Sequence, residues 1–410
     1  MLRDYWSFGV RNRRYLTFGL LVMGLSSFGQ TFFIALFGES LRAHFSISDG
    51  ELGSLYALAT FCSALSLGYV GRLIDHTSVR RFASIVIGML VLACLSMAFS
   101  VNVFMLGLSF YLLRLFGQGL MVHTGLTATA RAFSDHRGKA LGLVSLGLPV
   151  GEAVLPIAAV ASLALLDWRL TWALCAAVLV VLGSLALRLE RRPGAAKRFV
   201  AGHKATSGAP QNPPIVLWRD TRFLSVLPVI IASPFISTGF FFHQTRLAAE
   251  KGWMMSWVAI WFVGYAAVRA VGLIGVGPVV DRFTARRLVP FVLLPMMFAL
   301  ILLGLFEGAW AVPLYLGLFG LTSAAAGTVG VALWAELYGI ARLGRVRASV
   351  EAINVVATGA SPMVFGLLVD QGVDLTRQAQ ACLAYVVVAS ALAAYFSRNR
   401  NQCPVAMNDN

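Results

Sequence analysis

Three ionisable residues stand deep inside long apolar stretches of this 410-residue sequence. Arg114 lies in FYLLRLFGQGLMVHTG, Arg269 in FVGYAAVRAVGLIGVG and Glu152 in GLVSLGLPVGEAVLP. A guanidinium stays charged at every accessible pH, and its planar fork matches a carboxylate. The two arginines therefore predict a site for an anionic substrate. Glu152 has two interpretations, a proton carrier or one half of a static ion pair, with Arg114 as the candidate partner.

Other polar side chains in apolar stretches add candidate substrate contacts. Gln30 stands beside Thr31, and His243 stands beside Gln244. We expect Gln30 and His243 to hydrogen-bond the substrate, and the alternative is that they only satisfy neighbouring helices. No P-loop, H-E-x-x-H motif or G-x-S-x-G motif with partners occurs, and the five cysteines show no C-x-x-C spacing. The sequence thus predicts no catalytic residue, no metal site and no cofactor.

The elements that must position these residues are membrane helices. The chain is 58% hydrophobic and 12% charged, with a mean hydropathy of +0.78, whereas soluble domains contain about 25% charged residues. Apolar runs of about 18 to 25 residues are long enough to span a bilayer. The fold class expected is an all-α polytopic membrane protein with twelve spans, at 15–37, 51–72, 83–101, 103–130, 139–166, 169–188, 223–245, 254–279, 288–306, 309–336, 347–369 and 378–397.

The net charge of +15 reports membrane orientation and indicates no nucleic-acid partner. Alternate loops, beginning with the N-terminus, contain 26 of the 33 lysines and arginines when the span ends that border them are included. The positive-inside rule places such loops in the cytoplasm. We therefore expect both termini to be cytoplasmic and the protein to lie in the inner (plasma) membrane, with the lipid bilayer as its surroundings.

A repeated motif divides the chain into two halves. The segment Gly71–Arg81 reads GRLIDHTSVRR and Gly277–Arg287 reads GPVVDRFTARR, an offset of 206 residues. Several matches at one offset indicate duplication. Between the sixth and seventh spans lies a stretch rich in Pro, Gly, Lys and Arg, which is typical of a flexible linker. The domains predicted are an N-terminal six-helix half at 1–189, a cytoplasmic linker at 190–222 and a C-terminal half at 223–410.

Over essentially its whole length the chain resembles the major facilitator superfamily. The repeated motif is similar to the family's loop G-x-x-x-D-R-x-G-R-R/K, with His76 replacing the first basic residue and Ser78 and Thr284 replacing the second glycine. The resemblance implies two pseudo-symmetric halves that latch together at the cytoplasmic side. The predicted latch residues are Gly71, Asp75, Arg80, Arg81, Gly277, Asp281, Arg286 and Arg287. Glu336 and Glu351 are predicted as gate residues that bridge the halves to loop arginines such as Arg80 and Arg81.

The resemblance also suggests a function. The setting of Arg269 is similar to helix 8 of monocarboxylate porters, where an arginine pairs with the substrate carboxylate. The chain thus resembles a bacterial-type transporter of the superfamily that is similar to the monocarboxylate-porter-like branch. Arg114 resembles the family's helix-4 arginine motif. We expect a monomeric secondary transporter, not an enzyme, that moves a small organic anion, a monocarboxylate in particular, by proton symport or anion exchange. The alternatives are an efflux antiporter for drugs or metabolites and, from another class, a membrane-embedded enzyme or a non-transporting sensor.

Overall fold

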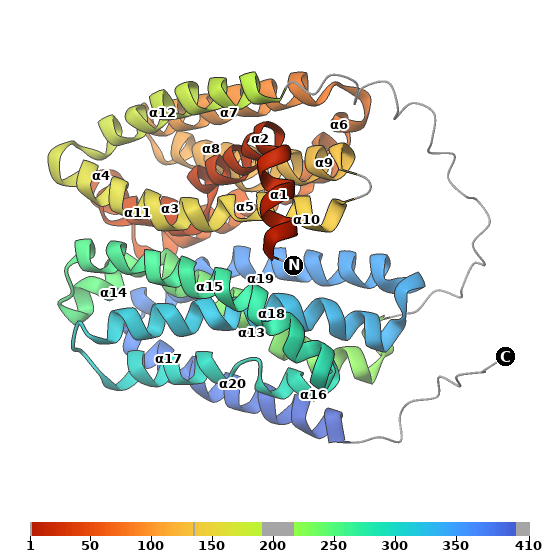
Figure 1. Cartoon of the computed structure of the whole chain (residues 1–410). Coiled ribbons are helices and arrows are strands. Elements are labelled where there is room, and N and C mark those ends of the chain that lie inside the picture. The colour runs from red at the N-terminus through yellow and green to blue at the C-terminus, as the bar shows by residue number, and fades with distance from the viewer. Residues whose placement is uncertain (1, 134–135, 191–216, 399–410) are drawn as a thin grey trace.

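The computed structural model describes residues 2–133, 136–190 and 217–398. Helices of the N-terminal and C-terminal parts form two separate bundles that face one another (Figure 1). Among the described residues, eleven helices are long and apolar enough to cross a membrane, and a bent pair of segments makes a twelfth span. This confirms the predicted fold class. Most of the predicted linker 190–222 lies outside the described residues.

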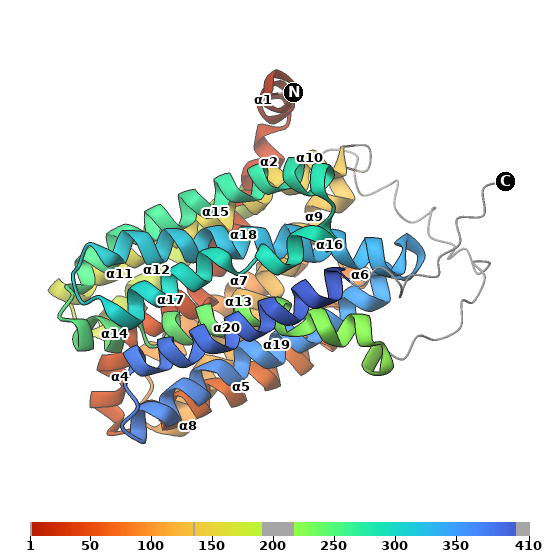
Figure 2. The same ribbon diagram turned by 90° about the horizontal axis from the view of Figure 1, so that it is seen from below.

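The N-terminal half runs from α1 to α12. Its α-helices are α1 Leu2–Arg11, α2 Arg13–Leu25, α3 Thr31–Ile34, α4 Gly38–Phe45, α5 Asp49–Val70, α6 Leu73–His76, α7 Val79–Ala98, α8 Val103–Leu112, α9 Val122–Ala132, α10 Arg137–Ser145, α11 Gly147–Leu165 and α12 Trp168–Leu189. A π-helix, Leu113–Met121, connects α8 to α9 within one span. The first helix, α1, projects from the side of the bundle (Figure 2).

The C-terminal half runs from α13 to α20. Its α-helices are α13 Thr221–Phe242, α14 Gln244–Lys251, α15 Met255–Phe283, α16 Ala285–Leu288, α17 Leu294–Leu305, α18 Ala311–Tyr338, α19 Ile340–Asp370 and α20 Leu375–Arg398. The predicted spans correspond to these helices with two main differences. The first span is broken by a 47° bend between Arg13–Gly29 and Thr31–Phe45, and α19 begins before the predicted start at 347.

Short polar side chains fix where several spans begin. Ser48 caps α5 in a reciprocal capping box with Glu51. Asp167 accepts a hydrogen bond from the backbone N–H of Leu170 at the start of α12. Asp220 caps α13. Burial by itself raises the pKa of Asp220, but hydrogen bonds donated by Arg222 have the larger effect and hold this pKa below its usual value. Each cap satisfies backbone N–H groups that a helix start leaves free.

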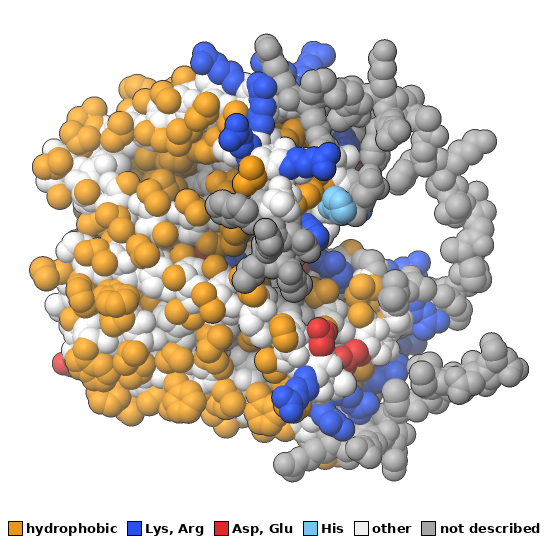
Figure 3. All heavy atoms as spheres, in the orientation of Figure 1, with side chains coloured by type: hydrophobic (Ala, Val, Ile, Leu, Met, Phe, Trp, Pro, Cys, Tyr) orange, Lys and Arg blue, Asp and Glu red, His pale blue; other side chains and the backbone are white. Residues whose placement is uncertain are grey.

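The two halves meet closely at one end of the bundle. We call the end where the described chain stops at Glu190 and resumes at Leu217 the linker end, and the other the opposite end. At the opposite end a Cβ atom on Gly53 of α5 would lie 2.3 Å from the carbonyl oxygen of Pro362 of α19. On the same helix toward the linker end, a Cβ on Gly68 would meet nothing within 4 Å. Lysine and arginine side chains gather at the linker end (Figure 3).

The two copies of the repeated loop are each tied to a helix of their own half. In the first copy Asp75 pairs with Arg131 near the end of α9. In the second copy the carboxylate of Glu336 on α18 accepts hydrogen bonds from the backbone N–H groups of Ala285 at 2.7 Å and Arg286 at 3.0 Å. The loops therefore occupy equivalent places but are held by different chemistry.

The two departures from the family's loop motif have different structural consequences. Thr284 adopts φ 68° and ψ 147°, a region that is essentially restricted to glycine. The structure thus explains why the family's motif has a glycine at this position. Ser78 adopts φ −68° and ψ 144°, and its side chain caps α7 by accepting a hydrogen bond from the backbone N–H of Arg81. The first copy uses serine as a helix cap, whereas the second copy places a threonine in a strained conformation.

Candidate functional site

A cavity of about 330 Å³ lies midway along the bundle between the two halves. This volume is within the range of small-molecule sites. Its lining is rich in hydroxyl and amide groups, and its charged residues are two arginines and one glutamate. The residues that line it are Gln30, Thr31, Phe32, Arg114, Gln118, Leu148, Glu152, Ile230, Ser233, Pro234, Ser237, Thr238, Phe241, Tyr265, Arg269, Ser323, Ala326, Gly327, Asn354 and Thr358.

Glu152 and Arg269 form an ion pair across the cavity. Glu152 belongs to α11 of the N-terminal half and Arg269 to α15 of the C-terminal half, and Nη1 of the arginine donates to Oε1 of the glutamate. The Glu152 side chain is 7% exposed and the Arg269 side chain 23% exposed. The other carboxylate oxygen, Oε2 of Glu152, is buried without a hydrogen-bond partner. The static partner suggested for Glu152, Arg114, is therefore the wrong arginine.

Close glycine contacts place both members of this pair. A Cβ on Gly320 of α18 would lie 2.7 Å from the carbonyl oxygen of Tyr265, so only glycine lets α18 approach the backbone of α15 beside Arg269. A Cβ on Gly151 of α11 would lie 2.1 Å from the Ser27 hydroxyl of the first span. These contacts set the position of each backbone, because a side chain at either glycine would push the helices apart.

Arg114 is buried in its own half and holds a break in the first span. Its guanidinium donates to the Thr31 hydroxyl at 3.3 Å and reaches the Gly29 carbonyl oxygen at 3.5 Å. Gly29 ends one helical segment and Gln30 caps the next. A cation stabilises carbonyl groups freed at a helix end. Among the described residues no carboxylate pairs with Arg114, and its Nε atom is buried without a partner.

The π-helix that carries Arg114 is packed directly against this break. A Cβ on Gly29 would lie 2.1 Å from the carbonyl oxygen of Leu113 and 2.7 Å from Cα of Gly117. Gly117 lies three residues after Arg114 in the same π-helix. The π-helical turn brings the Arg114 side chain toward the first span, and such turns recur at functional sites.

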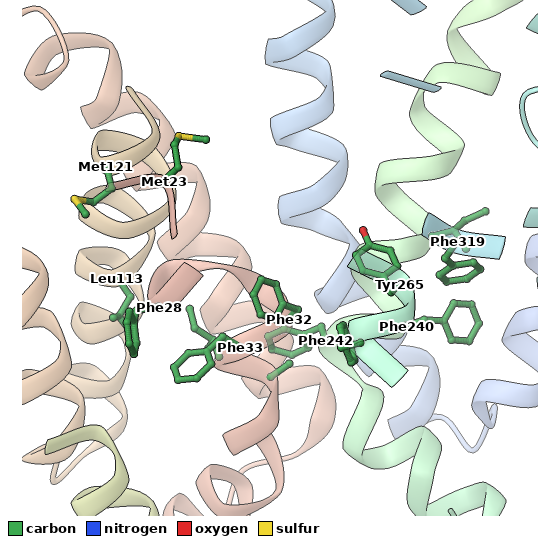
Figure 4. Close-up of a cluster of buried hydrophobic side chains, with 14 of the residues drawn as sticks. Met23, Phe28, Phe32, Phe33, Leu113, Met121, Phe240, Phe242, Tyr265 and Phe319 are labelled. Atoms are coloured by element: carbon green, nitrogen blue, oxygen red, sulfur yellow. The ribbon is translucent and has the colours of Figure 1, made fainter. Parts of the chain in front are cut away.

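Aromatic side chains fill the region between the halves beside the cavity. The rings of Phe32 and Phe262 are 6.1 Å apart, and those of Tyr56 and Phe242 are 4.7 Å apart, each pair joining the two halves. Phe32 and Phe242 lie between the N-terminal and C-terminal helices in Figure 4. These ring contacts join the halves beside the cavity, and the Tyr56 hydroxyl is also hydrogen-bonded to Thr31 of the lining.

Several buried polar atoms of the lining lack a protein partner. They are Oε1 of Gln118, Oδ1 of Asn354 and Oγ of Ser237, in addition to Nε of Arg114 and Oε2 of Glu152. Buried polar groups are normally hydrogen-bonded, and an orphaned group has a cost of about 1–3 kcal/mol. A polar ligand could satisfy them if these side chains turned toward the cavity, because the atoms themselves are buried in this conformation. The unpartnered atoms come from both halves, so a ligand that satisfies all of them contacts both.

The structure brings some of the predicted residues together and separates others. Arg114, Arg269, Glu152 and Gln30 all line the cavity. His243 does not line it; the imidazole is fully buried at the opposite end, where it contacts Asp49 and the Pro362 carbonyl oxygen.

The predicted latch and gate residues lie at the linker end. Arg80, Arg81, Asp281 and Arg287 are exposed there, whereas Gly71 is buried and a Cβ on Gly277 would meet nothing within 4 Å. The expectation that Glu336 bridges to Arg80 or Arg81 is wrong for this conformation, because its carboxylate is bound to its own half. Glu351 is exposed on α19.

Sequence reasoning found Gln30 and Thr31 but missed the other uncharged polar residues of the lining. Gln118 lies four residues after Arg114 and therefore on the same helix face, which was a usable signal. The hydroxyl of Tyr265 lies beside the Arg269 guanidinium, also four residues away. Asn354 and Thr358 have the same spacing on α19. Single amides and hydroxyls in membrane helices are too common to be selected without this spacing.

Two helical halves around a cavity at the middle of the bundle define a membrane transporter of the secondary type. Residues 19–263 match the Major Facilitator Superfamily, and the chain belongs to this family. This match does not distinguish the predicted monocarboxylate-porter-like branch from other members of the family. No curated protein sequence gives a significant match to the chain.

The fold is similar to that of solved transporters. A bacterial homologue of the human lysosomal transporter Spinster, inward-facing and occupied, has 16% sequence identity and a TM-score of 0.72, with 93% of this chain and 96% of that chain covered. Its inward-facing, unoccupied structure gives 15% identity and a TM-score of 0.73, with coverage of 94% and 97%. A mutant of the nucleoside transporter NupG gives 11% identity and a TM-score of 0.72, with coverage of 93% and 99%.

Proposed function

We propose that this protein carries a small organic anion, a monocarboxylate in particular, by alternating access of the central cavity. The observation that carries the proposal is the charge of the lining, in which two guanidiniums face a single carboxylate. One of them, Arg114, has no carboxylate partner among the described residues. A cavity with one excess positive charge attracts an anion, and a guanidinium fork suits a carboxylate.

The polar lining also bears on the substrate class. Hydroxyl groups of Thr31, Ser237 and Thr358 and amide groups of Gln118 and Asn354 face a small volume. Atoms of Ser237, Gln118 and Asn354 lack a protein partner, whereas the Thr31 and Thr358 hydroxyls are hydrogen-bonded within the protein. Packing an apolar ligand against the unpartnered groups is unfavourable, because buried polar groups must be satisfied. This argument favours a small polar anion over a lipophilic cationic drug, which would need acids in the cavity. The efflux antiporter remains the alternative that the experiment below tests.

The Glu152–Arg269 pair supplies a mechanism for coupling. While the pair is intact, Arg269 is not available to the substrate. Protonation of Glu152 removes its charge, so Arg269 becomes free to bind a substrate carboxylate, which is proton symport. If the substrate anion displaces the Glu152 carboxylate from Arg269 without a proton being bound, the protein exchanges one anion for another. In either case the pair joins the halves when the site is empty, and substrate takes its place when the site is filled.

The proposal includes an orientation and a location. The basic side chains gathered at the linker end favour a cytoplasmic position for that end and for both termini, in the inner membrane. The close contacts at the opposite end then correspond to a carrier closed to the outside. We further propose that a single chain is the functional unit, since one chain encloses the whole cavity.

Uptake of labelled small carboxylates into liposomes tests the proposed function. Purified protein is reconstituted and assayed with and without an inward proton gradient, beside Arg269→Gln and Arg114→Gln. Arg377→Gln is the matched control, because that arginine is 71% exposed and lies away from the cavity. We expect saturable uptake that both cavity variants lose and the control keeps, and stimulation by the gradient would distinguish symport from exchange.

The same vesicles test the alternative. If they transport a cationic dye and no carboxylate, the protein is an efflux antiporter and the proposal is wrong. If neither moves while the protein remains folded and monodisperse, a sensor or enzyme role becomes the better explanation.

A further inference from the structure

A buried contact between an acid and an imidazole joins the halves at the opposite end, outside the cavity. Nδ1 of His243, which follows α13, lies 3.4 Å from Oδ1 of Asp49, the first residue of α5. His243 is 0% exposed and Asp49 is 6% exposed. Because the two residues belong to different halves, this contact exists only while the halves meet at this end.

The surroundings of His243 fix one of its ring hydrogens. Nε2 lies 3.0 Å from the carbonyl oxygen of Pro362, which can only accept a hydrogen bond. Nε2 therefore carries the hydrogen, and a neutral imidazole would point the lone pair of Nδ1 at the Asp49 carboxylate. Both facing atoms are buried; Nδ1 lacks another hydrogen-bond partner, whereas Oδ1 also lies 2.7 Å from the guanidinium of Arg42. Two acceptors buried face to face are unfavourable, so the contact requires an added proton between them.

Charged groups on the packed elements hold Asp49 in this position. Arg42 of α4 places Nη1 2.7 Å from Oδ1 of Asp49, within the same half. Arg246 of α14 places Nη1 3.9 Å from Oδ2, across the halves. The side chain of Arg246 is also bound by Glu250 at 3.0 Å. The two guanidiniums orient the carboxylate so that Oδ1, the oxygen that Arg42 contacts, also faces the imidazole.

A second inter-half contact beside this site involves another acid. Asp370, the last residue of α19, accepts hydrogen bonds from the Ser48 hydroxyl at 2.6 Å and from the backbone N–H of Gly50 at 2.9 Å. Its hydrogen-bonding partners therefore do not include the imidazole. Asp370 holds the ends of α5 and α19 together without needing a proton, so the proton requirement is specific to the Asp49–His243 contact.

We propose that Asp49 and His243 form a proton-binding site that is assembled when the halves close at the opposite end and is lost when they part. Closure then takes up one proton, so the equilibrium constant for closure rises by up to about tenfold for each unit by which the pH falls. Acid on that side favours the conformation closed there. The inference rests on the alternating access of the proposed function, but it does not depend on which substrate is carried.

Distance measurements between the halves test this site without substrate. Spin labels are attached at Val101 and Ala309, exposed residues at the opposite end of the N-terminal and C-terminal halves, in a background whose five native cysteines are replaced. Double electron–electron resonance in nanodiscs then gives the ratio of closed to open populations between about pH 5.5 and about pH 8. With Asp49 and His243 both present, we expect the ratio of closed to open populations to fall by at least about tenfold as the pH rises across this interval.

Three variants make the result specific. His243→Gln keeps a hydrogen-bond donor but binds no proton, and Asp49→Asn removes the charge of the acceptor. In both variants the ratio of closed to open populations should therefore be independent of pH. His44→Gln is the matched control: His44 lies at the same end but contacts Arg169 within its own half, so its pH response should equal that of the unsubstituted site.

A ratio that does not change with pH in the unsubstituted protein, or a His243→Gln variant that responds as strongly, would overturn the proposal. Failure of carboxylate uptake would leave these distances unaffected, so the two proposals fail separately.

Discussion

Replacing Glu152 by glutamine separates the ion pair from the rest of the cavity. The variant keeps the size and hydrogen-bonding capacity of the side chain but mimics its protonated form, so Arg269 is permanently free to bind a carboxylate. A hydrogen bond between charged groups contributes about 1.5–3 kcal/mol. Because Glu152 is 7% exposed and Arg269 23% exposed, the solvent screens the pair only partly, and we expect carboxylate affinity to rise by about 10- to 100-fold.

The assay is equilibrium binding of a labelled carboxylate to purified protein over a range of pH. In the unsubstituted protein, affinity should increase as the pH falls, because protonation of Glu152 releases Arg269. The Glu152→Gln variant should bind tightly at every pH and should exchange substrate but no longer accumulate it with a proton gradient. Glu39→Gln is the control, because Glu39 is an exposed carboxylate on α4. This substitution should change neither the carboxylate affinity nor the accumulation driven by a proton gradient.

Two results would refute this reasoning. Unchanged affinity in Glu152→Gln would mean that the substrate does not displace Glu152 from Arg269. An unchanged pH dependence in the same variant would move the proton-linked step to another residue.

Three further predictions concern the scaffold. Arg114→Lys keeps a positive charge but loses the guanidinium fork, so carboxylate uptake should fall by at least about tenfold and the unfolding temperature in a thermal melt should decrease. Uptake and an unfolding temperature equal to those of the unsubstituted protein would contradict the role assigned to the fork. Gly53→Ala should shift inter-half distances toward the state open at the opposite end, because its Cβ would lie 2.3 Å from a carbonyl oxygen of α19, whereas Gly68→Ala on the same helix should not. Thr284→Gly should stabilise the protein by about 1 kcal/mol by relieving backbone strain, and Ser78→Gly should not, because it removes a helix cap; denaturation in mild detergent compares the two.

The halves and the cavity charges could be predicted from the sequence because each rests on a strong local signal. Long apolar runs define spans, and an arginine in such a run at Arg114 or Arg269 is too costly to be accidental. Glu152 was selected on the same ground. Its partner was not predictable, since which arginine it meets depends on how the halves dock.

The role of His243 illustrates what a single sequence leaves open. Nothing in the stretch GFFFHQTRLAAEKGW indicates that the imidazole meets Asp49 of the other half, because Asp49 lies in a polar loop region that carries no membrane signal. The bend of the first span was missed for a related reason. It is stabilised by the distant Arg114 and by the Gly29–Gly117 contact, and no proline marks it in the sequence.

The loop repeat implies an ancestral symmetry that the cavity no longer has. At the same 206-residue offset, the position equivalent to Arg114 is Gly320, the one equivalent to Arg269 is Ser63, and the one equivalent to Glu152 is Thr358. None of the charged lining residues has a charged counterpart in the other half. The duplicated scaffold therefore presents an interior whose charges are distributed asymmetrically between the halves. Such an interior cannot distinguish the two ends of a symmetric substrate. A substrate with a single anionic end would be held in the same orientation on every transport cycle.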